Sequence, residues 1–256
     1  MFKKFSRMAL LPIAFLAIAA TLFAFKKEKS PFAIKTPVAY ALNFTVQKTT
    51  TTAYENAGGS AYENVQPITE NENKSFSIQL SESGELNMTI RDLSPTSECV
   101  VTTLQNNTLT LYNAYGGVLQ QMQLDEKGLD LASLASMVTM ADKEALLAEI
   151  SNIQNGLAGP ENAGSQVKQL GGNMVKVENG DGETIVDTDN GLVTESKVMS
   201  NGVLVSETTY NSSRDGNGAY ILNSTQEKSY DAIPNSSARV VTSVTSNYNN
   251  FLLVKK

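Results

Sequence analysis

The chain has 256 residues, with 20 Lys and Arg against 26 Asp and Glu, a single Cys and no His. Without His, the Ser-His-Asp and Cys-His catalytic arrangements and histidine metal sites are excluded, and one Cys allows neither an intramolecular disulfide nor a structural zinc site. From these absences we expect no enzyme and no metal or cofactor. An acidic chain without runs of Lys and Arg is a poor match for nucleic acid, so we also expect no nucleic-acid partner.

Residues 1–30 have the features of an export signal. Lys3, Lys4 and Arg7 precede the uninterrupted apolar run Met8–Phe25, and small residues near its end suit a signal peptidase. The run is also long enough to stay as a membrane anchor, and basic residues flank it on both sides. We therefore expect an exported protein of the periplasm or cell envelope, either cleaved or anchored in the inner membrane through this run.

Residues 31–124 predict a tether followed by a β-meander. Two prolines favour a tether over residues 31–43, and the β-branched Thr tract within Phe44–Glu55 favours a strand. The stretch Asn56–Asn73, which contains two adjacent glycines and a proline, is typical of a long loop.

Clean alternation of apolar and polar side chains begins after this loop. Phe76, Ile78 and Leu80 share one face, and residues 86–90 repeat the pattern. We expect Cys99 to be buried between strands and inert, with a reactive or intermolecular role as the alternative. The expected strands are 75–80, 86–90, 99–104, 109–115 and 118–124.

The apolar period changes to that of a helix in the middle of the chain. Residues 129–137 predict a short helix, and Asp142–Asn155 predicts a longer one, with Asp142 as its cap and Gly156 at its end. The face of the longer helix is marked by Leu146, Leu147, Ile150 and Ile153. A flexible Gly-containing connection follows.

The stretch Gly182–Val254 reads as a second meander. Asp187–Gly191 and the Asn201-Gly202 pair each separate two extended segments, and Asx-Gly is a strong hairpin signal. A further strand pair is expected from Met174 onward. The remaining expected strands are 192–199, 203–210, 219–230 and 239–248.

These elements predict a mainly β (α+β) fold: a large curved antiparallel sheet or half-barrel built from two meanders, with one or two helices packed on it. We expect a single β-rich domain, and two β domains joined by helices are the alternative. The expected organisation is a signal or anchor over 1–30, a tether over 31–43, and a domain over 44–256 that divides into 44–124, 125–163 and 164–256.

Four acidic residues, Asp181, Glu183, Asp187 and Asp189, cluster around two turns. A calcium loop needs Gly at its sixth position and Glu at its twelfth, whereas counting from Asp187 places Gly191 fifth. Hairpin turns require the same residue types, so we interpret the cluster as turns rather than as a metal site. A pair of catalytic carboxylates is defined only by its spacing in space, and no motif supports one.

The C-terminal third contains Thr184-Ile-Val-Asp187, Asn190-Gly-Leu-Val193 and Asn201-Gly-Val-Leu-Val205, then Ile233-Pro234 before a last strand. This succession resembles the periplasmic LolA/LolB-like carriers that sort lipoproteins to the outer membrane. The resemblance implies a curved antiparallel sheet whose concave side is plugged by helices and binds acyl chains there.

We therefore expect a non-enzymatic envelope protein that binds an apolar ligand or a lipidated partner in a half-barrel cavity, by burial of acyl surface. The alternative is a membrane-anchored or surface structural module of the adhesion type, without a cavity. An enzyme with paired carboxylates is a third hypothesis, and the oligomeric state stays open. The candidate ligand-binding residues, each of which suits an ordinary core as well, are Phe76, Ile78, Leu86, Met88, Ile90, Leu146, Ile150 and Ile153.

Overall fold

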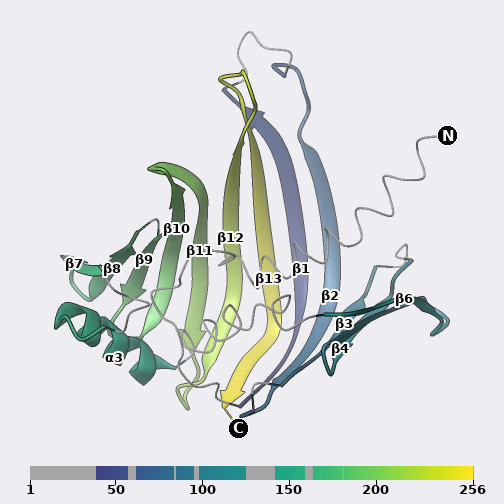
Figure 1. Cartoon of the computed structure of the whole chain (residues 1–256), viewed down its shortest axis with the longest axis horizontal. Coiled ribbons are helices and arrows are strands. Elements are labelled where there is room, and N and C mark those ends of the chain that lie inside the picture. Colours follow the sequence, from purple (N-terminus) through teal and green to yellow (C-terminus); the bar gives the residue numbers. More distant parts are fainter. Residues whose placement is uncertain are drawn as a thin grey trace.

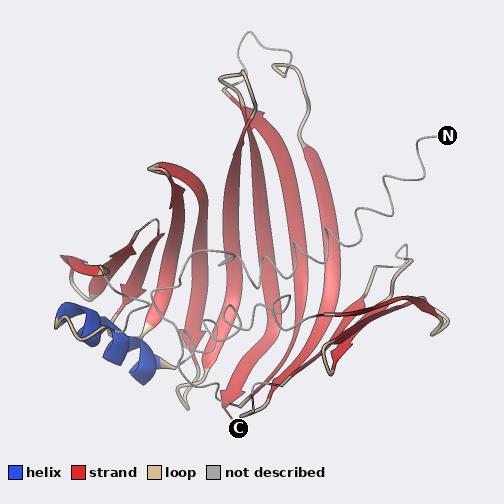
Figure 2. Cartoon of the chain, viewed as in Figure 1, coloured by secondary structure: helices blue, strands red, loops and turns tan. Residues whose placement is uncertain are grey.

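The described part of the chain is one open antiparallel sheet of 13 strands with one helix beside it (Figures 1 and 2). Among these residues the two edge strands, β6 and β7, each have a single neighbour. The expected fold class is confirmed. The structure is a computed structural model that describes residues 39–56, 62–83, 85–94, 98–124, 142–158, 164–180 and 182–255.

The first six strands form an N-terminal meander in which each strand pairs with the next. They are β1 (Tyr40–Glu55), β2 (Ile68–Leu80), β3 (Leu86–Asp92), β4 (Val101–Gln105), β5 (Thr108–Tyr112) and β6 (Val118–Gln123). Helix α3 (Lys143–Gln154) comes next in the chain. A second meander follows: β7 (Gln166–Gly171), β8 (Met174–Asn179), β9 (Gly182–Asp187), β10 (Leu192–Ser200), β11 (Val203–Arg214), β12 (Tyr220–Ala232) and β13 (Arg239–Lys255).

The two meanders join at the centre of the sheet through the first and last strands. β1 pairs with β13 along its whole length, from Tyr40 opposite Lys255 to Glu55 opposite Arg239. The chain therefore passes from one edge of the sheet (β6) to the other (β7), and α3 lies on that connection. Figure 1 shows β1, β2, β12 and β13 extending beyond the other strands at one end.

Irregularities in the ladders help the sheet to curve. Register shifts occur in five of the pairings among β1 and β9–β13, for example between Asn43 and Thr45 of β1 and between Asn211 and Ser212 of β11. A β-bulge leaves one residue unpaired, bends the strand and increases its twist.

The helix prediction is confirmed at both ends of α3. Asp142 accepts a hydrogen bond from the backbone N–H of Ala145 at 3.1 Å. At the other end, Gly156 has a φ of +69° and donates to Ile153, while Leu157 donates to the carbonyl of Asn152 at 2.8 Å. This is the Schellman arrangement, which satisfies the last carbonyls of a helix.

The Asx-Gly hairpin prediction is also confirmed. Asn201 and Gly202 have φ values of +51° and +76° between β10 and β11. A two-residue turn with positive φ at both positions matches the twist of the flanking strands, and Asn and Gly adopt it at the least strain.

Four strand predictions need correction, and one of them is the end of β13, which runs to Lys255 rather than to Tyr248. β1 begins at Tyr40 rather than at Phe44, because the inward alternation already includes Tyr40. Residues 68–73, expected to lie in the long loop, belong to β2 and pair with β1. β7 was not predicted at all, since the exposed, polar segment Gln166–Gly171 carries no apolar alternation.

Some expectations fall on residues outside the described part of the chain. These are the export signal or anchor at 1–30, most of the tether and the short helix at 129–137. Within the described residues, no helix combines the length and the apolar character needed to cross a membrane.

Candidate functional site

One face of the sheet carries both apolar cores, and we call it the core face. The larger of the two, the central core, contains side chains from strands of both meanders and so packs the two meanders against each other at the middle of the sheet. Its buried members are Tyr40, Leu42, Phe44, Val46, Phe76, Ile78, Leu80, Leu86, Met88, Ile90, Leu104, Leu109, Leu192, Tyr220, Leu222, Tyr248, Phe251 and Leu253.

Aromatic rings from three neighbouring strands pack at the middle of the central core. Phe44 of β1 stacks on Phe76 of β2 with ring centroids 4.7 Å apart and planes 3° from parallel. On its other side Phe44 contacts Tyr248 and Phe251 of β13, at 5.7 Å and 5.2 Å. These contacts fasten the joint between the two meanders, because β1 belongs to one and β13 to the other.

A smaller helix core lies under α3. Leu146, Ile150 and Ile153 of the helix pack against valines of β8, β9 and β10, while Tyr210 of β11 packs against both cores. The valines are Val175, Val177, Val186 and Val193. Figure 2 shows the helix beside this end of the sheet.

The eight candidate ligand-binding residues divide between these two cores. Phe76, Ile78, Leu86, Met88 and Ile90 belong to the central core. The three helix residues, 146, 150 and 153, belong to the helix core, so the structure does not bring all eight into one cluster. A ligand-binding role for any of them stays a prediction.

A row of polar side chains crosses the core face at the boundary of the central core. Successive members are directly opposite one another on neighbouring strands, apart from one two-residue step along β12 from Thr225 to Glu227. We call it the polar row; from β2 to β9 it consists of Glu72, Lys48, Ser246, Thr225, Glu227, Thr208, Ser196 and Thr184. Six of these eight are buried, although a sheet core is normally apolar.

Lys48 is the charged member at the centre of the sheet. It follows Val46 on the inward side of β1 and is only 6% exposed. Its Nζ lies 3.7 Å from the carboxylate of Glu72, which also accepts a hydrogen bond from Lys74 at 3.3 Å. One carboxylate therefore serves two ammonium groups.

Two hydroxyl members of the row, Ser196 and Thr225, are hydrogen-bonded to tyrosines of the cores. Ser196 shares a hydrogen bond with Tyr210 at 3.2 Å, and Thr225 shares one with Tyr248 at 3.5 Å. Burial raises the pKa of both tyrosines above the usual value of 10, so they stay neutral at physiological pH. The row therefore offers neutral hydroxyls beside its charged residues.

Glu227 is the member of the row whose charge changes near neutral pH. Its half-buried carboxyl makes no hydrogen bond or ion pair that is recorded among the described residues. Burial raises its pKa to about 7, and the positive charge of Lys48 partly opposes this rise. Near neutral pH the row therefore gains or loses a negative charge at this position.

Sequence reasoning missed the polar row, although part of the signal was present. Lys48 has the same parity as Leu42, Phe44 and Val46, which places it on the inward face of β1. The alignment of Ser246, on the last strand, beside Lys48 depends on the pairing of β1 with β13.

A second, polar site lies at the rim of the sheet near the start of α3. A pocket of ≈ 430 Å³ is lined there by residues that include Tyr40, Asp142, Lys143 and Arg214. Arg214 donates hydrogen bonds to the carbonyls of Asn190, Gly191 and Gly218 at 2.7, 2.8 and 3.0 Å. These bonds give Arg214 a structural role, in which it ties two hairpin turns together.

Of the acidic cluster, Asp181 lies outside the described residues, Glu183 pairs with Lys176 and Lys197, and Asp187 is used by its own turn. The Asp187 carboxylate accepts hydrogen bonds from the side chain of Asn173, the backbone of Asp189 and both the backbone and the side chain of Asn190. Its acceptor positions are thus used within the hairpin. Among the described residues, no group of three or more His, Cys, Asp or Glu could hold a metal ion.

Cys99 is buried, as expected from its sequence. Its Sγ lies 3.6 Å from the hydroxyl of Thr102 and 3.7 Å from the carbonyl of Val101. Burial among such groups is typical of a structural thiol.

No protein-family model matches the chain, and no curated protein matches it. It is similar to a domain from Vibrio parahaemolyticus described as an outer membrane lipoprotein-sorting protein, at 9% identity over 94% of this chain and 92% of that one, with a TM-score of 0.42. A DUF1329 family protein from Desulfovibrio piger is similar at 10% identity, over 94% and 91% of the two chains, with a TM-score of 0.37.

Proposed function

We propose that the protein is a non-enzymatic, exported envelope protein that binds an apolar ligand, or the acyl chains of a lipidated partner, on the core face of its sheet. The observation that carries the proposal is the combination of a broad central core with a polar row along its boundary. An amphiphile has the same division into an apolar and a polar part.

The position of the helix supports this proposal. α3 packs on the valines of β8–β10, whereas the central core lies mainly on β1–β5, β12 and β13, with Leu192 of β10 at its margin. Each CH₂ group of an acyl chain that leaves water for an apolar environment contributes about 0.8 kcal/mol.

The inward carboxylates have different surroundings. Glu72 lies on β2, where two lysines engage it. Glu227 lies on β12, with β1 and β13 between the two strands.

A second candidate function, a surface or adhesion module, is favoured by the far ends of the four long strands. We call residues 49–55, 68–71, 228–232 and 239–245 the distal ribbon (upper part of Figure 1). Cross-strand polar contacts hold it, such as Thr49 to Asn71 at 2.8 Å and Arg239 to Glu55 at 2.7 Å. An extended polar sheet of this kind suits contact with another surface.

Mass spectrometry of the protein purified from its native membrane fraction distinguishes the two functions. Spectra are recorded under gentle and under denaturing conditions. We expect acyl species that stay bound in the first and leave in the second. A protein that is empty and still begins at Met1 would overturn the binding proposal and favour the anchored module.

A further inference from the structure

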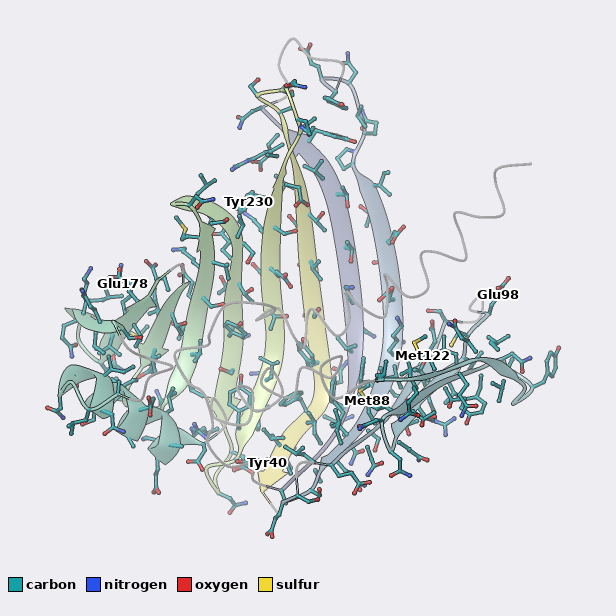
Figure 3. All side chains as sticks on the ribbon, viewed as in Figure 1. Tyr40, Met88, Glu98, Met122, Glu178 and Tyr230 are labelled. Carbon is teal, nitrogen blue, oxygen red and sulfur yellow. The ribbon has the colours of Figure 1, made fainter. Side chains whose placement is uncertain are left out.

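The polar pocket at the rim of the sheet, which we call the rim pocket, has room for a small molecule. Its volume of ≈ 430 Å³ falls within the range of about 300–1,000 Å³ that is usual for ligand pockets. It lies where three parts of the chain meet: the first turn of α3, the β11–β12 hairpin, and the adjoining ends of β1 and β13 at Tyr40 and Leu253. Figure 3 shows Tyr40 at this end of the long strands.

One part of the rim pocket is apolar. Tyr40, Tyr220 and Leu253 line it and are at the same time buried members of the central core. Burial raises the pKa of both tyrosines, that of Tyr220 to about 12, so both stay neutral at physiological pH. This part of the pocket therefore suits an apolar side chain of a ligand.

The rest of the lining carries both signs of charge. Arg214 and Lys143 are its cations, and Asp142 and Glu144 are its carboxylates. Arg214 donates to three turn carbonyls, and Lys143 donates to the carbonyl of Asp189. Asp142 caps α3 through the hydrogen bond described above. These bonds to neutral backbone groups fix the positions of three of the four charges.

The Asp142 carboxylate lies close enough to act on two other groups of the lining. Burial raises the pKa of Tyr40, and the negative charge of Asp142 raises it further. Burial lowers the pKa of Arg214, and the same negative charge partly opposes this change. A ligand in the rim pocket thus meets a carboxylate, a guanidinium and an apolar wall that neighbour one another.

We propose that the rim pocket binds a small zwitterion with an apolar side chain, of the class of an apolar dipeptide with free ends. The ligand carboxylate pairs with Arg214 and the ligand ammonium pairs with Asp142. Its apolar side chain lies against Tyr40, Tyr220 and Leu253. Charge-assisted hydrogen bonds of this kind are roughly twice as strong as neutral ones. The inference does not depend on the function proposed above, because it concerns the rim pocket and not an acyl chain on the core face.

The test uses a fluorescent dipeptide, because the chain itself contains no Trp. Leu-Trp carries both charges, N-acetyl-Leu-Trp lacks the ammonium, and Leu-Trp amide lacks the carboxylate. Binding to the full chain is followed by the Trp fluorescence of the peptide for the wild type, for Asp142→Asn and for the control Glu149→Gln. Asn still caps a helix, and Glu149 lies on the same helix outside the pocket lining.

We expect the wild type to bind Leu-Trp at least roughly 10-fold more tightly than either capped form, because each cap removes a charge-assisted hydrogen bond. Asp142→Asn lowers the affinity for Leu-Trp to about that for N-acetyl-Leu-Trp, and it leaves the affinity for the acetylated form within about twofold. Glu149→Gln changes neither affinity. If Asp142→Asn does not fold, the wild-type comparison of the three peptides decides alone.

Each other result overturns a defined part of the proposal. Equal binding of the three peptides overturns the zwitterion as the ligand. An Asp142→Asn variant that binds Leu-Trp as tightly as the wild type overturns the rim pocket as the site. A wild type that binds none of the peptides overturns the whole inference, and the proposed function keeps its own test, because acyl species are detected by mass spectrometry without any peptide.

Discussion

The same four strands, β1, β2, β12 and β13, behave differently in their two halves. Near Tyr40 their inward side chains form the central core. In the distal ribbon polar side chains lie on both faces, and every side chain except that of Val241 is half-buried or exposed. Figure 3 shows Tyr40 at one end of these strands and Tyr230 toward the other. The polar row marks the change between the halves.

The strand register is therefore set differently in the two halves. In the central core a slip by one residue would turn Leu42 and Phe44 to the solvent face, so burial alone specifies the pairing. In the distal ribbon such a slip moves few apolar groups. Its register depends on continuity with the core and on cross-strand contacts such as Thr51 to Thr69 and Glu55 to Arg239.

The largest expected effect compares two aromatic pairs of the same geometry. Phe44 stacks on Phe76, and Tyr54 of the ribbon stacks on Tyr62, both with ring centroids 4.7 Å apart. Phe44→Ala should lower the free energy of unfolding by about 3–5 kcal/mol because it leaves a buried cavity. Tyr54→Ala should lower it by about 1 kcal/mol, since Tyr54 is only partly buried. Urea denaturation measures both, and equal losses would contradict the distinction between the halves.

The second prediction concerns the polar row between the halves. Glu72→Gln removes the carboxylate shared by Lys48 and Lys74, and it should lower the free energy of unfolding by about 2–3 kcal/mol, because two largely buried cations lose their partner. Lys48→Met should lower it by less than about 1 kcal/mol or raise it, because Glu72 keeps Lys74. Denaturation of the ligand-free variants tests the order, and a greater loss for Lys48→Met would contradict it.

The third prediction uses the pH dependence of Glu227. Its folded-state pKa of about 7 lies above the usual 4.5, so the native state holds this proton more tightly than the unfolded chain does. Its contribution to stability is therefore complete below pH 4.5 and is lost as the pH rises through 7. Glu227→Gln should raise the free energy of unfolding by about 1–2 kcal/mol at pH 8 and change it little at pH 4.5. The same gain at both pH values would rule out an elevated pKa.

The smallest effect is expected in the distal ribbon. Arg239 bonds to Glu55 and lies 4.4 Å from the ring centroid of Tyr230, at an exposed position. Arg239→Gln should lower the free energy of unfolding by about 0.5 kcal/mol at low salt and by less at 1 M salt, because exposed ion pairs are screened. A loss above about 2 kcal/mol would show that this contact sets the register of the ribbon.

Much of the fold could be predicted from local signals in the sequence. Phe76, Ile78 and Leu80 alternate cleanly and lie in β2 as expected, and Asp142 and Gly156 bound α3 as expected. These features depend on the backbone geometry and side-chain period of a few consecutive residues, so they can be read from the sequence without its partners.

The tertiary structure decided what depends on distant partners. Residues 68–73 show no alternation of apolar and polar side chains, because polar groups occupy both faces there, and β7 shows none as an edge strand. Both segments are extended because they pair with a neighbouring strand. The pairing of β1 with β13 joins residues at opposite ends of the chain, and this pairing places Ser246 beside Lys48. The sequence by itself determined the strand-rich fold, the helix and the hairpin turns, whereas the polar row exists only once the two meanders meet.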